Sequence, residues 1–171
     1  DTFQAAAINA DNITSGTLNT ARITDGSITN AKLATPGLVV QVVTATSTST
    51  KSTTSTSYVD TNLSASITPS SSSNKILVLV QGQIYIATDG GQSITTLLRG
   101  TTNLGNSDRG MMQHSDFEDR FQANASMIYL DSPSTTSSTT YKVQIKVYSG
   151  SHTIYFGVDG TPQTMTLLEV K

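Results

Sequence analysis

Large hydrophobic residues recur at every fifth position through the first 38 residues of the chain. They are Phe3, Ile8, Ile13, Leu18, Ile23, Ile28, Leu33 and Leu38. Small or turn-forming residues stand two positions before the aliphatic ones: Ala6, Asp11, Gly16, Ala21, Gly26, Ala31 and Pro36. On an α-helix this spacing places successive side chains about 140° apart, and on a β-strand it sends them to alternate faces. The chain must therefore bend once per repeat, so that every large side chain returns to one axis.

Two architectures fit a chain that bends in this way. One is a right-handed quadrilateral solenoid, because the small residue before each aliphatic residue resembles the pattern of pentapeptide-repeat proteins. The other is an intertwined shaft made of several identical chains. A lone solenoid would contain only about two coils, near or below the roughly three repeats that stacking needs. We therefore favour a multi-chain shaft over residues 1–37, with a disordered linker as the third alternative.

The composition limits what the remaining 134 of the 171 residues can form. Without cysteine, the chain has neither disulfides nor a cysteine metal site, so its stability must come from packing and association. The formal net charge is −2 and the ten basic residues are dispersed, which argues against nucleic-acid binding. No apolar run approaches the ~20 residues of a membrane span. We expect no nucleic-acid partner and no membrane insertion.

Strand patterns follow one another from residue 38 to the C-terminus, separated by turn-forming residues. The sequence predicts strands at 38–45, 57–67, 75–87, 93–99, 124–130, 140–148, 152–158 and 163–170. The Ser/Thr run at 44–57 is expected to be a loop, and 100–123 a long loop with or without a short helix. Eight antiparallel strands without βα alternation predict an all-β head at 38–171, a jelly-roll β-sandwich or a related sandwich.

Few residues suggest chemistry. His114, Asp116, Glu118 and Arg120 alternate and would share a face if extended, but a metal site there is less favoured than surface ion pairs. No nucleophile elbow is present. We therefore expect no metal, no cofactor and no enzymatic activity. Five tyrosines are expected mostly in or beside the core, with one or two available to stack on a sugar: Tyr58, Tyr85, Tyr129, Tyr148 and Tyr155.

Four short segments carry a resemblance to a known class of protein. They are SYVDT at 57–61, SITP at 66–69, SSNKILV at 72–78 and DGSITNAKL at 25–33. The first three resemble a block found in fibre proteins of tailed bacteriophages, and the last resembles shaft repeats of the same proteins. The resemblance implies a homotrimer on the virion, exposed to the extracellular medium, with a distal head related to C1q and tumour-necrosis-factor heads. An upstream part of the fibre or other virion proteins would be its further partners.

The expected function is attachment of a trimeric virion fibre to a host-surface glycan or protein. The alternatives are a bacterial trimeric adhesin and, less favoured, a glycan depolymerase. If strand direction reverses at each of the eight strands, the loops 46–56, 88–92, 131–139 and 159–162 lie far from the shaft. The loops 68–74, 100–123 and 149–151 then face back or wrap the side. Expected receptor contacts are Asp89, Gly90, Gly91, Asp131, Ser132, Ser134, Asp159 and Gly160, with Arg109, Asp116 and Arg120 as a lateral alternative.

Overall fold

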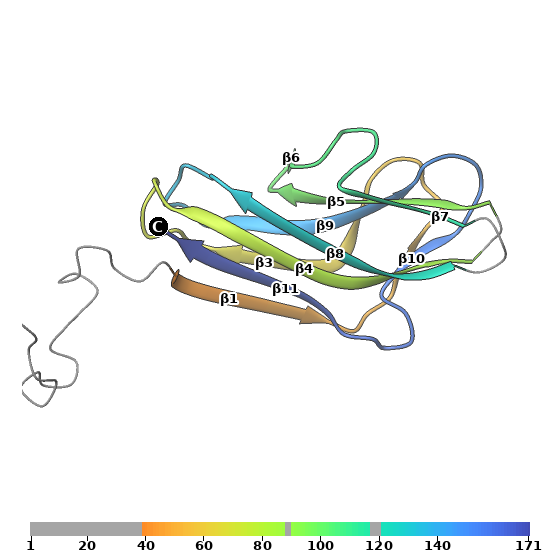
Figure 1. Cartoon of the computed structure of the whole chain (residues 1–171), viewed down its shortest axis with the longest axis horizontal. Coiled ribbons are helices and arrows are strands. Elements are labelled where there is room, and N and C mark those ends of the chain that lie inside the picture. Colours follow the sequence, from red (N-terminus) through yellow and green to blue (C-terminus); the bar gives the residue numbers. More distant parts are fainter. Residues whose placement is uncertain (1–38, 88–89, 117–120) are drawn as a thin grey trace, which may run out of the picture. The chain divides into compact units, whose positions relative to one another are not determined.

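The computed structural model describes residues 39–87, 90–116 and 121–171, all within the second of the chain's two units, Leu38–Lys171 (Figure 1). The predicted shaft residues lie outside the described residues: Phe3, Ile8, Ile13, Leu18, Ile23, Ile28, Leu33 and Leu38. The described residues form eleven strands and no helix. The strands are β1 Val39–Ser47, β2 Lys51–Thr53, β3 Val59–Ile67, β4 Lys75–Ile86, β5 Gln92–Arg99, β6 Thr102–Asn103, β7 Met112–Ser115, β8 Phe121–Asp131, β9 Thr139–Val147, β10 Ile154–Phe156 and β11 Gln163–Val170.

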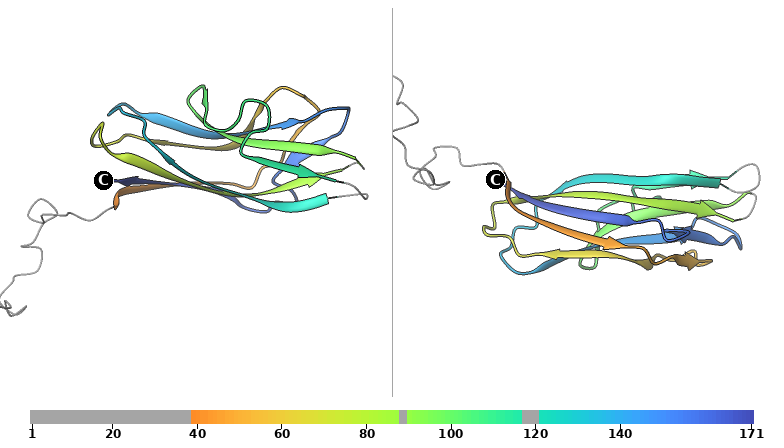
Figure 2. Two further views of the ribbon diagram at one scale, coloured as in Figure 1. Left: turned by 45° about the horizontal axis from the view of Figure 1, so that its top comes forward. Right: turned by 90° about the horizontal axis from the view of Figure 1, so that it is seen from below.

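The strands form two antiparallel sheets, which face each other as two layers (Figure 2). In sheet A, β4 pairs with β8 along one side and with β10 and β11 along the other. Strands β10 and β11 pair in turn with β2 and β1. In sheet B the order is β3, β9, β5, with both β6 and β7 paired to β5. Successive strands frequently change sheet, so neighbours in the sequence are seldom neighbours in a sheet.

Strands β10 and β11 run in the same direction along one edge of β4. Ile154 to Phe156 pairs with Ile86 to Ile84, and Thr164 to Val170 pairs with Gln81 to Lys75. Residues 157–162 therefore form an excursion within one interrupted strand. The predicted Asp159-Gly160 turn is present, with positive φ at both residues and a hydrogen bond from Thr161 N to Val158 O of 2.9 Å. An Asp-Gly pair between two strands usually closes a hairpin, but this turn does not, because its flanking strands pair with β4 and not with each other.

Alternating side chains from both sheets form a shared hydrophobic core. Among its largest fully buried members are Leu63, Ile84, Ile145, Tyr141, Phe156 and Met165. Gly82 is needed in β4 because a Cβ there would lie 2.5 Å from Cζ of Phe156. The Phe156 ring thus occupies the space above the glycine, which ties β10 to the middle of β4.

The sandwich has two ends, which the strand pairing defines. At the near end, β1 begins and β11 ends, and the C-terminus lies beside the start of β1 (Figure 1). The turns at 68–74 and 132–138 also lie there, since Ile67 pairs with Thr139 and Ile76 with Asp131. At the far end, Ile86 pairs with both Phe121 and Ile154. Backbone hydrogen bonds from Asp116 N to Gly91 O and from Tyr148 N to Gln92 O join the far-end segments.

All eight predicted ranges overlap a strand, but the predicted loops and directions need correction. The expected loop at 44–57 contains the end of β1 and all of β2, and the expected loop at 100–123 contains β6, β7 and the start of β8. Because β7 adds a reversal, β8 runs toward the near end, so the 131–139 loop lies there and not at the far end. For the same reason, the 149–151 turn lies at the far end. The 159–162 turn leaves sheet A just short of the far end, level with the stretch of β4 between Gln81 and Ile84.

Candidate functional site

The outer face of sheet A is apolar toward the near end. Two rows of directly opposed residues run across the neighbouring strands β1, β11, β4 and β8. One row is Val42, Leu168, Leu77 and Leu130, and the next is Thr44, Thr166, Leu79 and Ile128. We call the six aliphatic residues of these rows the aliphatic face. Three of them are well exposed, at 56% for Val42, 71% for Ile128 and 50% for Leu130. Single exposed aliphatic residues are ordinary, but rows of them on one sheet face indicate a contact surface.

The outer face of sheet B has the opposite character. Lys142 Nζ lies 2.8 Å from an oxygen of Asp60, and Gln144 Nε2 donates to the same carboxylate at 2.5 Å. The Lys142 hydrogen bond and then the Gln144 hydrogen bond lower the pKa of Asp60. Lys146 lies 4.8 Å from the centre of the Tyr58 ring. Where β3 and β9 pair, sheet B therefore presents a charged and hydrogen-bonding surface, of the kind that water solvates well.

A row of polar and aromatic side chains crosses the far end of sheet A, on the same outer face. Tyr85 of β4 lies opposite Gln122 of β8 on one side and Tyr155 of β10 on the other, and Tyr155 lies opposite Ser52 of β2. The two tyrosine rings are 5.5 Å apart between centroids and inclined by 37°. Cross-strand pairing thus places two aromatic side chains next to each other on the surface.

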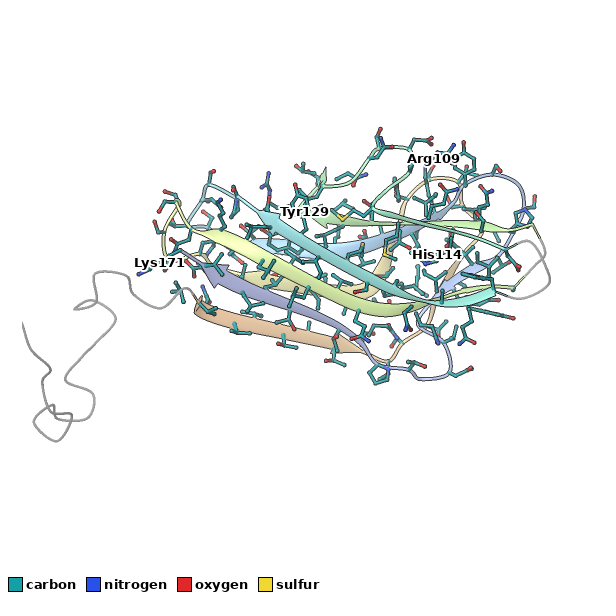
Figure 3. All side chains as sticks on the ribbon, viewed as in Figure 1. Arg109, His114, Tyr129 and Lys171 are labelled. Carbon is teal, nitrogen blue, oxygen red and sulfur yellow. The ribbon has the colours of Figure 1, made fainter. Side chains whose placement is uncertain are left out.

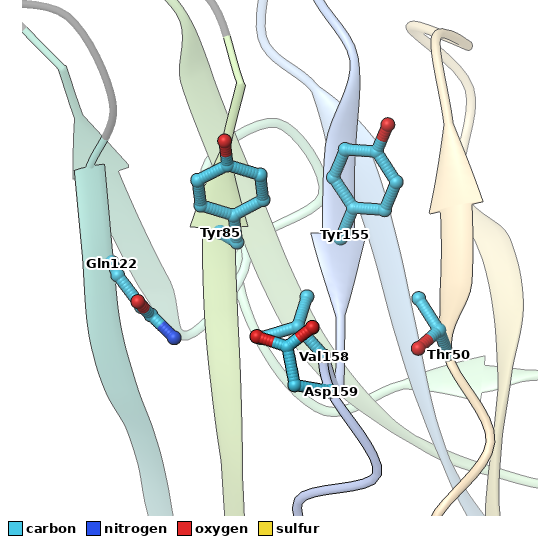
Figure 4. A pocket seen from close by; sticks show the side chains of 6 residues that line it. All are labelled: Thr50, Tyr85, Gln122, Tyr155, Val158 and Asp159. Atoms are coloured by element: carbon cyan, nitrogen blue, oxygen red, sulfur yellow. The ribbon is translucent and has the colours of Figure 1, made fainter.

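These tyrosines line a pocket of about 550 Å³, which we call the tyrosine pocket. Its lining residues are Thr50, Tyr85, Gln122, Tyr155, Val158 and Asp159. Figure 4 shows the two rings side by side, with Gln122 and Thr50 on opposite flanks and the Asp159 carboxylate between and below them. Asp159 reaches this place because the 157–162 excursion carries it over sheet A, at a φ of 54° that Asp tolerates better than most residues.

The predicted receptor residues are not brought together. Gly90 and Gly91 lie at the far end, Ser132 and Ser134 are exposed at the near end, and Asp89 and Arg120 lie outside the described residues. Asp159 and Gly160 belong to the excursion beside the tyrosine pocket. Arg109 lies on the loop between β6 and β7, away from Lys171 (Figure 3). Its guanidinium lies 3.9 Å from the centre of the Tyr148 ring and donates to the Tyr148 hydroxyl at 2.6 Å.

Asp131 is buried, contrary to its expected place on an exposed loop. It is the last residue of β8, and only 4% of it is exposed. Arg99 Nη1 donates to its two oxygens at 2.8 and 2.9 Å, and the buried Tyr141 hydroxyl donates to it at 2.6 Å. Burial first, and then the hydrogen bond to the Asp131 carboxylate, raises the pKa of Tyr141 far above its usual value. Through these hydrogen bonds, the Asp131 side chain links β8 to β5 and β9 at the near end.

His114 and Asp116 do not form a metal centre with a third ligand among the described residues. His114 is half-buried beside Phe121, with 5.8 Å between ring centroids, and burial lowers its pKa against the opposing effect of a hydrogen bond with the Asn124 backbone. Asp116 is buried, and its backbone amide donates a hydrogen bond to Gly91 O at the far end. Glu118, the other carboxylate of the predicted cluster, lies outside the described residues.

Glu169 is a buried carboxylate that the sequence did not single out. It accepts hydrogen bonds from Gln41 Nε2 at 2.6 Å, from the Ser70 amide and hydroxyl at 2.7 Å each, and from Asn74 Nδ2 at 2.6 Å. Burial opposes its ionisation, but the hydrogen bonds from Asn74, Ser70 and Gln41 outweigh this effect and lower its pKa to about 2. The carboxylate thus fastens the 68–74 turn to β1 and β11.

We expect Glu169→Gln to lower the free energy of unfolding by about 1–3 kcal/mol near neutral pH, because an amide cannot accept all four donors. Since the folded-state pKa is below the ordinary value of 4.5, the wild-type advantage is complete above that pH and is lost as the pH falls toward about 2. Urea unfolding at several pH values measures this. Asp60→Asn, at an exposed ion pair, is the control and should cost less than about 1 kcal/mol. A wild-type advantage that stays constant down to the lowest pH would contradict the prediction.

Sequence reasoning found Tyr85 and Tyr155 only as members of a set of five tyrosines, and it missed Thr50, Gln122 and Val158. Thr50 and Gln122 stand in segments expected to be loops, and only the pairing of β2, β4, β8 and β10 brings them to one pocket. No local signal in the sequence predicts that register.

The part of the chain that the structure describes has no helix able to cross a membrane. No model of a known protein family matches this sequence, and a search of curated proteins finds no significant match.

Proposed function

We propose that this chain is the distal part of a homotrimeric virion fibre, whose head attaches to a glycan or protein on the host surface without catalysing a reaction. The observation that carries the proposal is the aliphatic face on sheet A, in a chain whose N-terminal repeat is predicted to need partners to bury its large side chains. Lys75 is the only charged residue among the outward-facing positions of the described sheet A strands. Identical copies can approach such a face without charge repulsion.

The aliphatic face begins on the strand that directly follows the predicted shaft in the sequence. The predicted shaft ends at residue 37, and β1, which contributes Val42 to the aliphatic face, begins at Val39. A multi-chain shaft would deliver several copies of β1 close together, and their apolar faces would then bury one another. Each fully buried leucine or isoleucine contributes roughly 1.5–3 kcal/mol, repeated in every copy.

The strand order supports a jelly roll as the finer description of the head. Leaving out the short β2, β6 and β10, the strands β1, β3, β4, β5, β7, β8, β9 and β11 are eight in chain order. Sheet A then has the order 1-8-3-6, and sheet B the order 2-7-4-5. This winding between two four-stranded sheets favours a jelly roll, a fold used by viral capsid and lectin domains. It agrees with the head that the phage-fibre resemblance implies.

Three measurements test the proposal. Light scattering of the full chain should return about three times the protomer mass of 18.0 kDa. Antibodies raised against the head should label fibre tips on virus particles in electron micrographs, and the fluorescently labelled protein should bind the host cells. A mass equal to one protomer would exclude the trimer, and labelling of bacterial surfaces in place of particles would favour the adhesin.

A further inference from the structure

We propose that the tyrosine pocket binds neutral pyranose sugars of a surface glycan, an inference that rests on the proposed attachment function and names its ligand and site. The pocket lies on the outer face of sheet A at the far end, beyond the rows of the aliphatic face. Between them stand polar rows such as Thr46, Thr164, Gln81 and Ser126. The pocket is therefore separate from the surface assigned to contacts between copies.

The two rings provide an apolar platform for the face of a sugar. Tyr85 and Tyr155 are half-buried, and their rings lie side by side with their faces turned toward the viewer in Figure 4. The C–H groups on one face of a pyranose are apolar and pack against aromatic rings, whereas its hydroxyls point outward from the ring edge. The buried Val158 completes the apolar part of the lining. Tyrosine gives such contacts at low conformational cost because only two side-chain angles must be fixed.

The polar groups around the platform match sugar hydroxyls. The Asp159 carboxylate accepts hydrogen bonds, the Gln122 amide both donates and accepts, and the Thr50 hydroxyl does both. A few polar groups around an apolar floor are typical of small-molecule sites, and about 550 Å³ is within the usual range for them. The turn at Asp159 and Gly160 has a defined conformation, with a hydrogen bond between the residues on either side, so the backbone that carries the carboxylate is held beside the two rings.

The charge of the pocket limits which sugars it accepts. Asp159 carries the only carboxylate among the described lining residues, and none of them is lysine or arginine. Uronic, sialic and sulfated sugars carry anionic groups that usually require a cationic partner. The carboxylate would repel them. A single acid also lacks the second carboxylate that glycoside hydrolysis ordinarily uses, so binding without cleavage is expected.

The test uses the full chain and named probes: oligomers of galactose, glucose and mannose, with oligogalacturonate as the acidic counterpart of the galactose oligomer. Saturation-transfer NMR and titration calorimetry should detect binding to at least one neutral oligomer and no binding to oligogalacturonate. Tyr85→Ala and Tyr155→Ala should each weaken binding by about tenfold or more. Asp159→Asn keeps a residue that tolerates positive φ and should weaken binding several-fold, which keeps the test decisive if a tyrosine variant fails to fold.

Tyr148→Ala is the matched control, because it makes the same truncation next to Arg109, outside the pocket, and should leave sugar affinity unchanged. Failure of every neutral oligomer to bind would overturn the inference, as would tighter binding of oligogalacturonate. Dissociation of the trimer by Tyr155→Ala would also overturn it, since the rings would then belong to the interface. If the protein is trimeric and antibodies against it label virus particles, but no neutral oligomer binds, this inference is wrong and the proposed function stands.

Discussion

Replacing Asp131 by alanine is expected to lower the free energy of unfolding of the head by about 3 kcal/mol. The substitution leaves the buried Tyr141 hydroxyl without its acceptor and Arg99 without its carboxylate. The Arg99 side chain is 29% exposed, so water can partly replace its lost hydrogen bonds. Tyr141 is fully buried, so water cannot replace the acceptor of its hydroxyl. Urea unfolding followed by circular dichroism, at one protein concentration for all variants, measures the loss.

Two further variants separate the parts of this cluster. Tyr141→Phe removes only the hydroxyl and should cost about 1–2 kcal/mol, and the double variant should cost less than the sum because the two groups share one interaction. Ser132→Ala, at the exposed neighbouring position, is the control and should change stability by less than about 0.5 kcal/mol. If Asp131→Ala left stability unchanged and abolished host binding, Asp131 would be a receptor contact and its structural role would be secondary.

Strand positions could be predicted because the signal for them is local. Alternation such as Tyr141, Val143, Ile145 and Val147 records which side chains face the core, and each of these residues is indeed buried. Strand β7 has no such alternation, since Met112, His114 and Ser115 are all half-buried and the segment is only four residues long. Missing that one strand reversed the direction assigned to β8, and the end assigned to the 131–139 loop changed with it.

Partners across the fold could not be predicted for a different reason. Asp131 is followed by a Ser/Thr-rich segment, which is typical of an exposed loop, and nothing near it identifies Arg99, 32 residues earlier, as its partner. Glu169 likewise alternates with apolar residues at the end of β11, and its donors come from β1 and the 68–74 turn. Their roles depend on strand register, which a single sequence does not contain.

The chain contains no cysteine, so one introduced thiol reports on one position and can test whether the aliphatic face is covered. We expect Ile128→Cys to react with a maleimide at least about tenfold more slowly than Ser64→Cys, because the core of an interface between copies excludes water and reagent. In a single protomer the order would be reversed or equal, since Ile128 is 71% exposed and Ser64 is an exposed residue of β3 on the outer face of sheet B. Mass spectrometry of timed samples measures both rates.

Two comparisons make this result specific to association. In urea the two thiols should react at equal rates, which excludes an intrinsic difference between the sites. Adding Leu77→Lys should restore fast labelling at Ile128→Cys, because a charge in the adjacent row opposes burial of the face against another copy. Equal rates for the two thiols in the native full chain would show that the aliphatic face is open, and contacts between the heads would then have to be sought elsewhere, with the N-terminal repeat alone holding the chains together.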